Sequence, residues 1–235
     1  MNDHAPVEAF RSKILELELA KLDGEPDSRF VNMMRTLLRE QRVWVDAARM
    51  RNLRRQCERY AGIVGAFVEC GVAMGGSLAL MKAYGGRRRA VWGFDSFEAM
   101  PALGVQDGGD GAVYVGLRCS GDEGERAVSR TFELVGVAMD DVHVVAGWFD
   151  AQLPAHRAGI GPIALLRLDA DWYDATRFCL ETLYDQVIAG GAVIIDDYHT
   201  FRGCREAVDE FRAARAIDDP LIVTDPRSEV YWLKS

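Results

Sequence analysis

Short apolar runs alternate with longer amphipathic stretches from Gly62 to the end of the chain. The apolar runs are four to eight residues long, as buried strands are, and lie at 65–70, 90–95, 141–147, 162–169, 191–196, 221–224 and 230–234. Between them, apolar residues recur at helical spacing at 76–84, 123–136, 175–188 and 203–215. Near-continuous apolar strands that alternate with helices indicate an α/β protein whose parallel sheet is covered on both faces.

The last two predicted strands are separated by only the five residues 225–229. A crossover helix needs more residues than this, so we expect these strands to form an antiparallel hairpin. A mostly parallel, seven-stranded sheet that ends in such a hairpin resembles the class I methyltransferase form of the Rossmann-like fold.

The N-terminal part of the chain has a different pattern, which predicts helices only. Apolar positions at helical spacing run over 7–24, and a second stretch over 28–60 has an apolar face and an arginine-rich face. We predict an N-terminal helical segment, 1–60, and a catalytic domain, 61–235, within one structural domain. The apolar face of the second stretch either packs on the core, covers a site or forms a dimer contact.

The composition is that of an ordinary globular protein: 49% of the 235 residues are hydrophobic, 27% are charged, and the net charge is -8. This acidic balance argues against nucleic acid or an anionic membrane as a partner. No stretch has the pattern of a signal peptide or the length of a membrane span, and the five cysteines include no C-x-x-C pair. We therefore expect a cytoplasmic protein with reduced cysteines.

A glycine turn follows the first predicted strand, in FVECGVAMGGS. Glu69 and Gly71 end the strand, and Gly75 and Ser77 open the next helix. Glycines let the backbone approach a ligand, and a helix N-terminus offers free N–H groups. The turn departs from the G-x-G-x-x-G of dinucleotide sites, which favours S-adenosylmethionine over NAD.

The next two strands end in residues that suit a nucleoside. Asp95, at the tip of the second strand in GFDSF, is placed to accept hydrogen bonds from ribose hydroxyls. After the third strand, Gly147 allows close approach, and Trp148 and Phe149 are candidates to flank an adenine ring. The alternative for the two aromatic residues is packing of the loop onto the sheet.

Clustered carboxylates follow the fourth and fifth strands. Asp169 and Asp171 lie in LDADWYDA, and Asp196 and Asp197 lie in AVIIDDYH. Carboxylates brought together repel one another unless a cation compensates, and an all-oxygen set suits Mg²⁺, Ca²⁺ or Mn²⁺. The alternative is that they are turn and capping acids, which is our prediction for Asp174, directly before a helix.

A hard cation beside a methyl donor indicates methyl transfer to a hydroxyl. The cation would lower the pKa of the hydroxyl, and a carboxylate that is not a ligand would take the proton. Asp171, two residues beyond Asp169, is suitably placed for this base role. Arg167 shares the parity of Asp169 in a buried strand, and we expect it to balance part of the acidic charge.

Most of residues 40–235 resembles the macrocin O-methyltransferase (TylF-type) family of S-adenosylmethionine- and Mg²⁺-dependent sugar O-methyltransferases from antibiotic biosynthesis. The resemblance rests on FVECGVAMGGS, GFDSFEAMP, VVAGWFDAQLP, LDADWYDAT and GGAVIIDDYHTFRGCREAVDEF. It implies Asp171 as the base and metal ligation by Asp169, Asp196 and Asp197. It also implies cofactor contacts by Glu69, Gly71, Ser77, Asp95 and Ser96.

The resemblance further implies a glycoside acceptor, an N-terminal helical lid over the sugar and a homo-oligomer. We expect acceptor contacts from residues beside the acids, namely Tyr173, Tyr198 and His199; the alternative for His199 is a surface position. Two features depart from the family pattern: Ala73-Met74 replaces a Trp-Arg pair, and His199 follows D-D-Y where a small residue is usual.

Two other functions share some of these motifs. A catechol-type O-methyltransferase uses a similar D-A-D and D-D/N arrangement, but usually with asparagine at the position of Asp197. A D-x-D glycosyltransferase, from a different class, binds a nucleotide sugar through its metal. The glycine turn before Asp95 and the second acid pair argue against it.

Overall fold

The computed structural model describes the backbone of residues 5–109 and 111–235, with side chains from Lys13 onward. Within this range a seven-stranded sheet has the order β3-β2-β1-β4-β5-β7-β6. The strands are β1 (Ala66–Cys70), β2 (Val91–Asp95), β3 (Val142–Ala146), β4 (Ile163–Leu168), β5 (Val187–Ile195), β6 (Ile222–Val223) and β7 (Val230–Leu233). β1 to β5 are parallel, and β7 runs antiparallel to both β5 and β6. The predicted fold class is confirmed.

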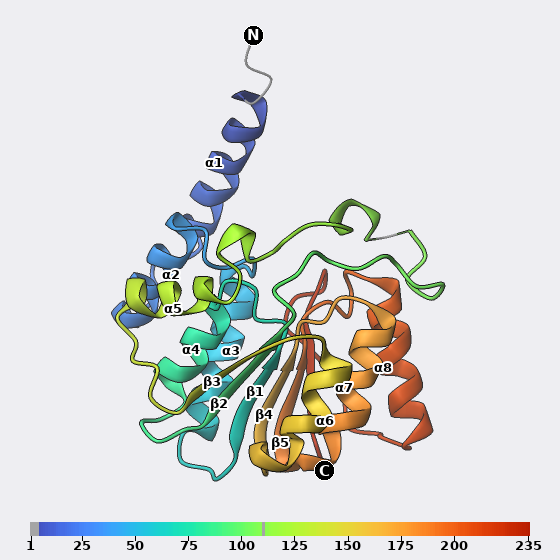
Figure 1. The fold of residues 1–235 in the computed structure, drawn as a ribbon. Coiled ribbons are helices and arrows are strands. Elements are labelled where there is room, and N and C mark those ends of the chain that lie inside the picture. Colours follow the sequence, from blue (N-terminus) through green and yellow to red (C-terminus); the bar gives the residue numbers. More distant parts are fainter. Residues whose placement is uncertain (1–4, 110) are drawn as a thin grey trace.

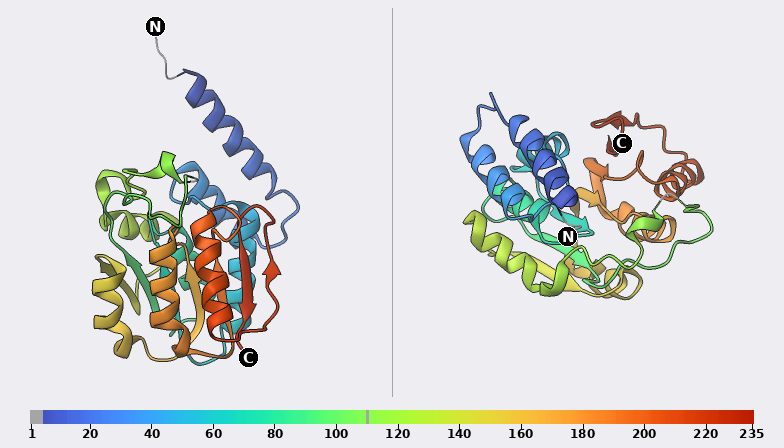
Figure 2. Two further views of the ribbon diagram at one scale, coloured as in Figure 1. Left: turned by 90° about the vertical axis from the view of Figure 1, so that its right-hand side faces the viewer. Right: turned by 90° about the horizontal axis from the view of Figure 1, so that it is seen from above.

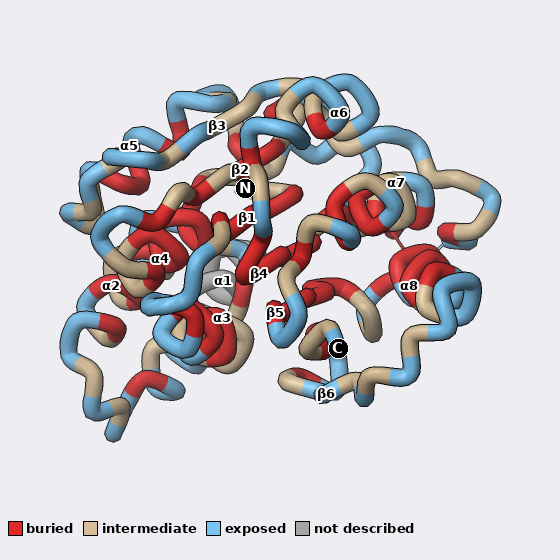
Figure 3. Tube along the Cα trace, turned by 90° about the horizontal axis from the view of Figure 1, so that it is seen from below, coloured by how far each residue is buried: buried red, intermediate tan, exposed pale blue. Residues whose placement is uncertain are grey.

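Helices cover both faces of the sheet (Figure 1). Phe67 and Leu165 belong to the hydrophobic cluster on one face, and Val68 and Leu166 belong to the cluster on the other. Because successive strand residues point to opposite faces, strands buried on both sides are apolar throughout. The first face packs against α2 (Ser28–Arg39), α3 (Ala47–Tyr60), α4 (Gly76–Tyr84) and α5 (Arg126–Val135), and the second against α6 (Phe149–Ile160), α7 (Tyr173–Leu183) and α8 (Arg202–Ala214). Figure 3 shows the buried strands between helices whose outer sides are exposed.

The N-terminal helices differ in their relation to this core. α1 (Ala5–Ala20) projects away from the body of the molecule, whereas α2 and α3 are part of it (Figures 1 and 2). Phe30, Met34 and Leu53 are buried in the cluster that contains Phe67 of β1. The apolar face of 28–60 therefore packs on the core, the first of its three alternatives.

The helices differ from the sequence predictions in two places. The single helix expected over 28–60 is two helices, because Asp46 caps α3 by accepting hydrogen bonds from the backbone N–H groups of Ala48 (2.8 Å) and Arg49 (3.1 Å). α6 was not predicted; it contains Pro154, a residue that is disfavoured inside a helix. No helix in the described part of the chain combines the length and apolar character that crossing a bilayer requires.

Candidate active site

A cavity of about 780 Å³ opens beyond the carboxyl ends of the parallel strands. Open α/β sheets bind their ligands at this edge, because the loops that follow the strands converge there. The strand ends contribute Gly71, Asp95, Trp148, Asp169 and Asp197. Further lining residues come from helix α1 (Ile14, Glu18), the segment before α3 (Trp44), α3 itself (Arg49) and the loop after β2 (Met100, Tyr114, Leu117).

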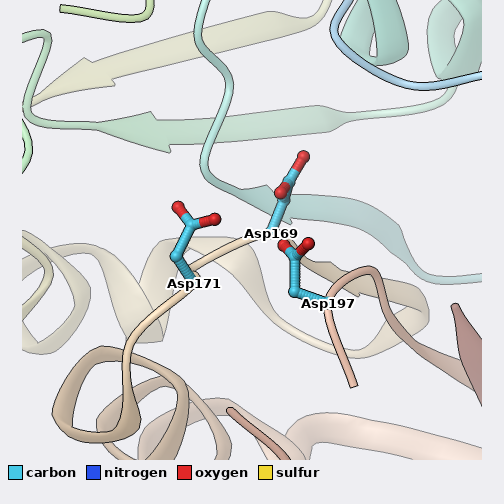
Figure 4. Close-up of side chains that lie close together, drawn as sticks. All are labelled: Asp169, Asp171 and Asp197. Atoms are coloured by element: carbon cyan, nitrogen blue, oxygen red, sulfur yellow. The ribbon is translucent and has the colours of Figure 1, made fainter. Parts of the chain in front are cut away.

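Three carboxylates meet at the floor of this cavity. Asp169, Asp171 and Asp197 each offer one oxygen, and these oxygens lie within 4.8 Å of one another. Figure 4 shows the three side chains converging from the segments that follow β4 and β5. Asp171 has a φ of 58°, a left-handed conformation that aspartate tolerates better than most residues. The sharp turn after β4 brings Asp171 to the same side as Asp169.

The electrostatics of this group favour a bound cation. Burial raises the pKa of Asp171 and of Asp197 well above the ordinary value, and the neighbouring carboxylates raise both further. Oδ2 of Asp197 is buried and has no hydrogen-bond partner among the described residues. An unpartnered buried oxygen within an all-oxygen set fits a hard divalent ion.

Arg167 lies at the centre of a buried ionic network behind these acids. Its guanidinium donates to Glu69 (2.8 Å), Asp169 (2.9 Å) and Asp196 (2.5 Å). The carboxylates raise the pKa of Arg167, although burial alone would lower it. The expectation that Arg167 balances part of the acidic charge is confirmed.

Replacing Arg167 with methionine should lower the free energy of unfolding by about 3–5 kcal/mol, because it leaves buried carboxylates without a counter-charge. Urea denaturation measures this effect. Arg130→Met is the matched control: its ion pair with Glu133 is exposed (side chains 56% and 69% accessible), so its loss should cost less than about 1 kcal/mol. Equal midpoints for the two variants would contradict the role given to Arg167.

Asp196 is also bound by a second arginine. Nη1 of Arg49, on α3, donates to Oδ2 of Asp196 (2.5 Å) and to Oγ of Ser228 (2.9 Å). Because Arg167 donates to Oδ1, both oxygens of Asp196 accept hydrogen bonds from arginines. The group of three neighbouring carboxylate oxygens is completed by Asp171 and not by Asp196. Each carboxylate oxygen has a second lone pair, so Asp196 keeps capacity for a further ligand. Sequence reasoning missed Arg49, since nothing in the arginine-rich 28–60 marks it out.

The expected cofactor residues fall into two groups. Asp95 lines the cavity, and its side chain accepts hydrogen bonds from the backbone N–H groups of Val72 (2.8 Å), Ala73 (2.8 Å) and Phe97 (2.7 Å). Asp95 thus fixes the glycine turn after β1. The predicted cofactor residues that line the cavity are Gly71, Asp95, Ser96, Trp148 and Phe149. The other predicted cofactor residues do not line it in the described structure: Glu69, Gly75, Ser77 and Gly147.

Gly71 shows why the turn after β1 needs a glycine. Its φ is 92°, and a Cβ atom there would lie 1.8 Å from the backbone oxygen of Asp169. Glu69, in contrast, is fully buried against Arg167, and this ion pair directs its carboxylate into the protein rather than toward the cavity.

The three expected acceptor contacts point elsewhere in this structure. The hydroxyl of Tyr173 donates to Glu210 (2.7 Å), and that of Tyr198 donates to Asp209 (2.6 Å). His199 lies against Arg205, with 2.6 Å between Nδ1 and Nη2. Proximity to the acids along the chain was a misleading signal, because the chain turns outward into α7 and α8. The aromatic side chains that line the cavity are instead Trp44, Tyr114, Trp148, Phe149, Trp172 and Phe201.

Asp174 does not cap α7. This helix begins at Tyr173, so Asp174 lies in its first turn, and the capping residue Trp172 makes no side-chain capping bond. The backbone N–H of Tyr173 donates instead to Asp107 (2.8 Å), a residue of the loop after β2. A local pattern such as D-A-T cannot reveal a cap that comes from 66 residues away.

Comparison with known proteins gives consistent matches. A family model described as Macrocin-O-methyltransferase (TylF) matches residues 33–234. The demethyldecarbamoylnovobiocin O-methyltransferase of Streptomyces niveus is 38% identical over 196 residues, which are 80% of this chain and 73% of that enzyme. The 8-demethyl-8-(2,3-dimethoxy-alpha-L-rhamnosyl)-tetracenomycin-C 4'-O-methyltransferase of Streptomyces olivaceus is 36% identical over 221 residues, 89% of this chain and 82% of that one. The solved structure of the O-methyltransferase NovP superposes with a TM-score of 0.74 at 33% identity, covering 96% of this chain and 99% of that one.

Proposed function

The chain belongs to the macrocin O-methyltransferase (TylF) family, and we propose that it transfers a methyl group from S-adenosylmethionine to a sugar hydroxyl of a glycosylated natural product. It is an O-methyltransferase with the class I fold, and similar enzymes act on antibiotics, one of them on a rhamnosyl group. The observation that carries the proposal is the group of three carboxylates at the floor of the cavity.

The donor is proposed to bind over the ends of β1, β2 and β3. Gly71 lets the backbone approach it, Asp95 and Ser96 face its ribose, and Trp148 and Phe149 flank its adenine. All five line the cavity. S-adenosylmethionine supplies an electrophilic methyl group, so the protein has to hold that methyl in line with the acceptor oxygen.

Replacing Asp95 with alanine should weaken binding of S-adenosylhomocysteine about tenfold or more, because the carboxylate orders the turn at Gly71 and faces the ribose. Isothermal titration calorimetry measures this affinity. Asp140→Ala, an exposed acid of the loop before β3, serves as the control and should bind as the wild type does. An unchanged affinity for Asp95→Ala would place the ribose elsewhere.

The metal is proposed to be Mg²⁺, held by Asp169, Asp196 and Asp197. Arg167 forms ion pairs with Asp169 and Asp196, so part of the negative charge of these two carboxylates is already compensated from behind. The unpartnered Oδ2 of Asp197 is available to a cation. When bound, the ion would supply positive charge beside the acceptor hydroxyl and lower its pKa.

Asp171 is proposed as the general base. It lies two residues beyond Asp169 in the turn between β4 and α7, and its carboxylate, unlike that of Asp169, forms no ion pair with an arginine among the described residues. It can therefore take the proton of the acceptor hydroxyl as the oxygen attacks the methyl group. The new bond joins the acceptor oxygen to the methyl carbon, and the sulfonium becomes a neutral thioether.

A methyl-transfer assay with Mg²⁺ tests the acceptor class. The panel should contain glycosylated natural products, their aglycones and simple catechols, with labelled S-adenosylmethionine as the donor. We expect methylation of glycosides on the sugar and none of the aglycones. Methylation of catechols alone would overturn the sugar proposal in favour of the catechol alternative.

The homo-oligomer, the cytoplasmic location and a lid formed by residues 1–60 stay predictions. Ile14, Glu18 and Trp44 of that segment line the cavity, which is consistent with a lid.

A further inference from the structure

We propose that Asp107 is a positioning residue that latches the loop after β2 onto the N-terminus of α7 and so sets the acceptor-side wall of the cavity. That this wall contacts the acceptor rests on the proposed function. The contact between Asp107 and α7 rests on the geometry of the structure alone. Six residues of this loop line the cavity: Met100, Pro101, Tyr114, Leu117, Cys119 and Ser120.

The burial pattern of this loop is inverted. Val105 is 96% exposed and Val113 is 84% exposed, whereas Asp107 is only 4% exposed. An acidic side chain is rarely so buried unless it has hydrogen-bond partners. The exposed valines bury little apolar surface and so contribute little to holding the loop. Asp107 therefore adds a buried polar anchor to the apolar contacts that Met100, Leu103 and Tyr114 make with the protein.

Asp107 holds two separate backbone groups. Its Oδ1 accepts a hydrogen bond from the N–H of Tyr173 (2.8 Å), and its Oδ2 accepts one from the N–H of Gly104 (2.8 Å). The N–H of Tyr173 is among the first of α7, which have no partner within the helix, and a negative charge is favourable there. Asp107 thus supplies the cap that the residues around α7 itself lack.

Two glycines, one on α8 and one in the loop itself, make room for the latched loop. A Cβ atom on Gly203, in the first turn of α8, would lie 1.9 Å from Oδ1 of Asp107. A Cβ on Gly111, in the loop, would lie 2.2 Å from the ring of Trp172. The φ of Gly203 is not positive, so space rather than backbone conformation is what this position requires.

The latch lies between the loop and the acid cluster. Trp172, which follows Asp171 directly, packs against Phe201 with ring centroids 5.1 Å apart, and Phe201 packs against Tyr114 of the loop at 5.8 Å. These three aromatic residues all line the cavity. Release of Asp107 would therefore free Tyr114 from the wall beside the acids.

The base of the loop is closed independently of Asp107. The N–H of Met100 donates to the carbonyl of Leu117, and the N–H of Gly116 donates to the carbonyl of Met100, both at 2.9 Å. Loss of the latch should consequently loosen the tip of the loop and leave the donor side, where Asp95 and Trp148 lie, in place. The expected signature is a higher KM for the acceptor with unchanged kcat and unchanged donor affinity.

The test combines Asp107→Ala with Gly203→Ala, which leaves Asp107 intact but fills the space that it occupies. Alanine favours helix more than glycine does, so α8 should not be weakened by the second variant. Asp122→Ala, an exposed acid of the segment that follows this loop, is the control. Hydrogen–deuterium exchange without acceptor follows the loop and the amides of Gly104 and Tyr173. Kinetics use the glycoside that the panel assay identifies, and calorimetry uses S-adenosylhomocysteine.

We expect both variants to speed exchange in the loop and at Tyr173, and to raise the acceptor KM about tenfold with kcat and S-adenosylhomocysteine affinity within about twofold. Unchanged exchange in both variants would overturn the latch. Faster exchange with an unchanged KM would overturn the role of the loop as the acceptor-side wall. If no glycoside in the panel is methylated, the proposed function fails, while the exchange data still decide the latch.

Discussion

Replacing Asp171 with asparagine is expected to lower kcat by about 10²- to 10⁴-fold, the range that general-base catalysis supplies. Asparagine has nearly the same size and shape but cannot accept the proton of the acceptor hydroxyl. Asp171 lies within the group of three carboxylates and has no ion pair with an arginine in the described part of the chain, so its charge is not taken up by the network around Arg167. Steady-state kinetics with the glycoside that the panel assay identifies measure the effect.

Two controls separate the base role from other roles of Asp171. Asp174 lies three residues further on and is exposed on α7. Asp174→Asn should keep kcat within about twofold, since substitutions of exposed residues usually change stability little. Asp171→Asn itself should bind S-adenosylhomocysteine and Mg²⁺ as the wild type does. Near-normal turnover would remove Asp171 from the base role, and loss of Mg²⁺ binding would make it a metal ligand instead.

The central strands of the sheet were predictable because both of their faces are buried. Apolar runs such as IALLRL in β4 have no polar alternation, which is typical of a covered parallel sheet. β5 extends further than predicted, from Val187 rather than Gly191, because the exposed Ala189 and Gly190 interrupt the apolar run that marks the strand. No helix was predicted at 149–160, where α6 lies; this helix contains Pro154 and buries only Leu153 and Ile160, so its apolar pattern is short.

The acidic floor of the site was predictable for a topological reason. Adjacent parallel strands end at the same edge, so residues 169–171 and 196–197 had to meet once β4 and β5 were neighbours. Arg49 and Asp107 could not be found in the same way. Each comes from a helix or loop far away in sequence, and its partner is defined only by the packing of the whole chain.

Removal of divalent ions is the second change with a large expected effect. Chelation should lower methyl transfer at least about 10²-fold, since the ion is proposed to supply several kcal/mol of charge stabilisation at the acceptor oxygen. Added Mg²⁺ should restore the rate, whereas Na⁺ at the same ionic strength should not. Full activity in excess chelator would overturn the metal proposal. Asp171 would then have to act as the base without a metal ion.

Calorimetric titration of Mg²⁺ tests whether the aspartates beyond β4 and β5 hold a divalent ion, and it does so without depending on the acceptor. Titrated into the complex with S-adenosylhomocysteine, Mg²⁺ should bind the wild type at one site per chain and bind Asp171→Asn alike. Asp197→Asn, which loses the charge of the carboxylate whose Oδ2 lacks a hydrogen-bond partner, should show no such binding. Equal Mg²⁺ affinity in the wild type and Asp197→Asn would contradict the proposed site.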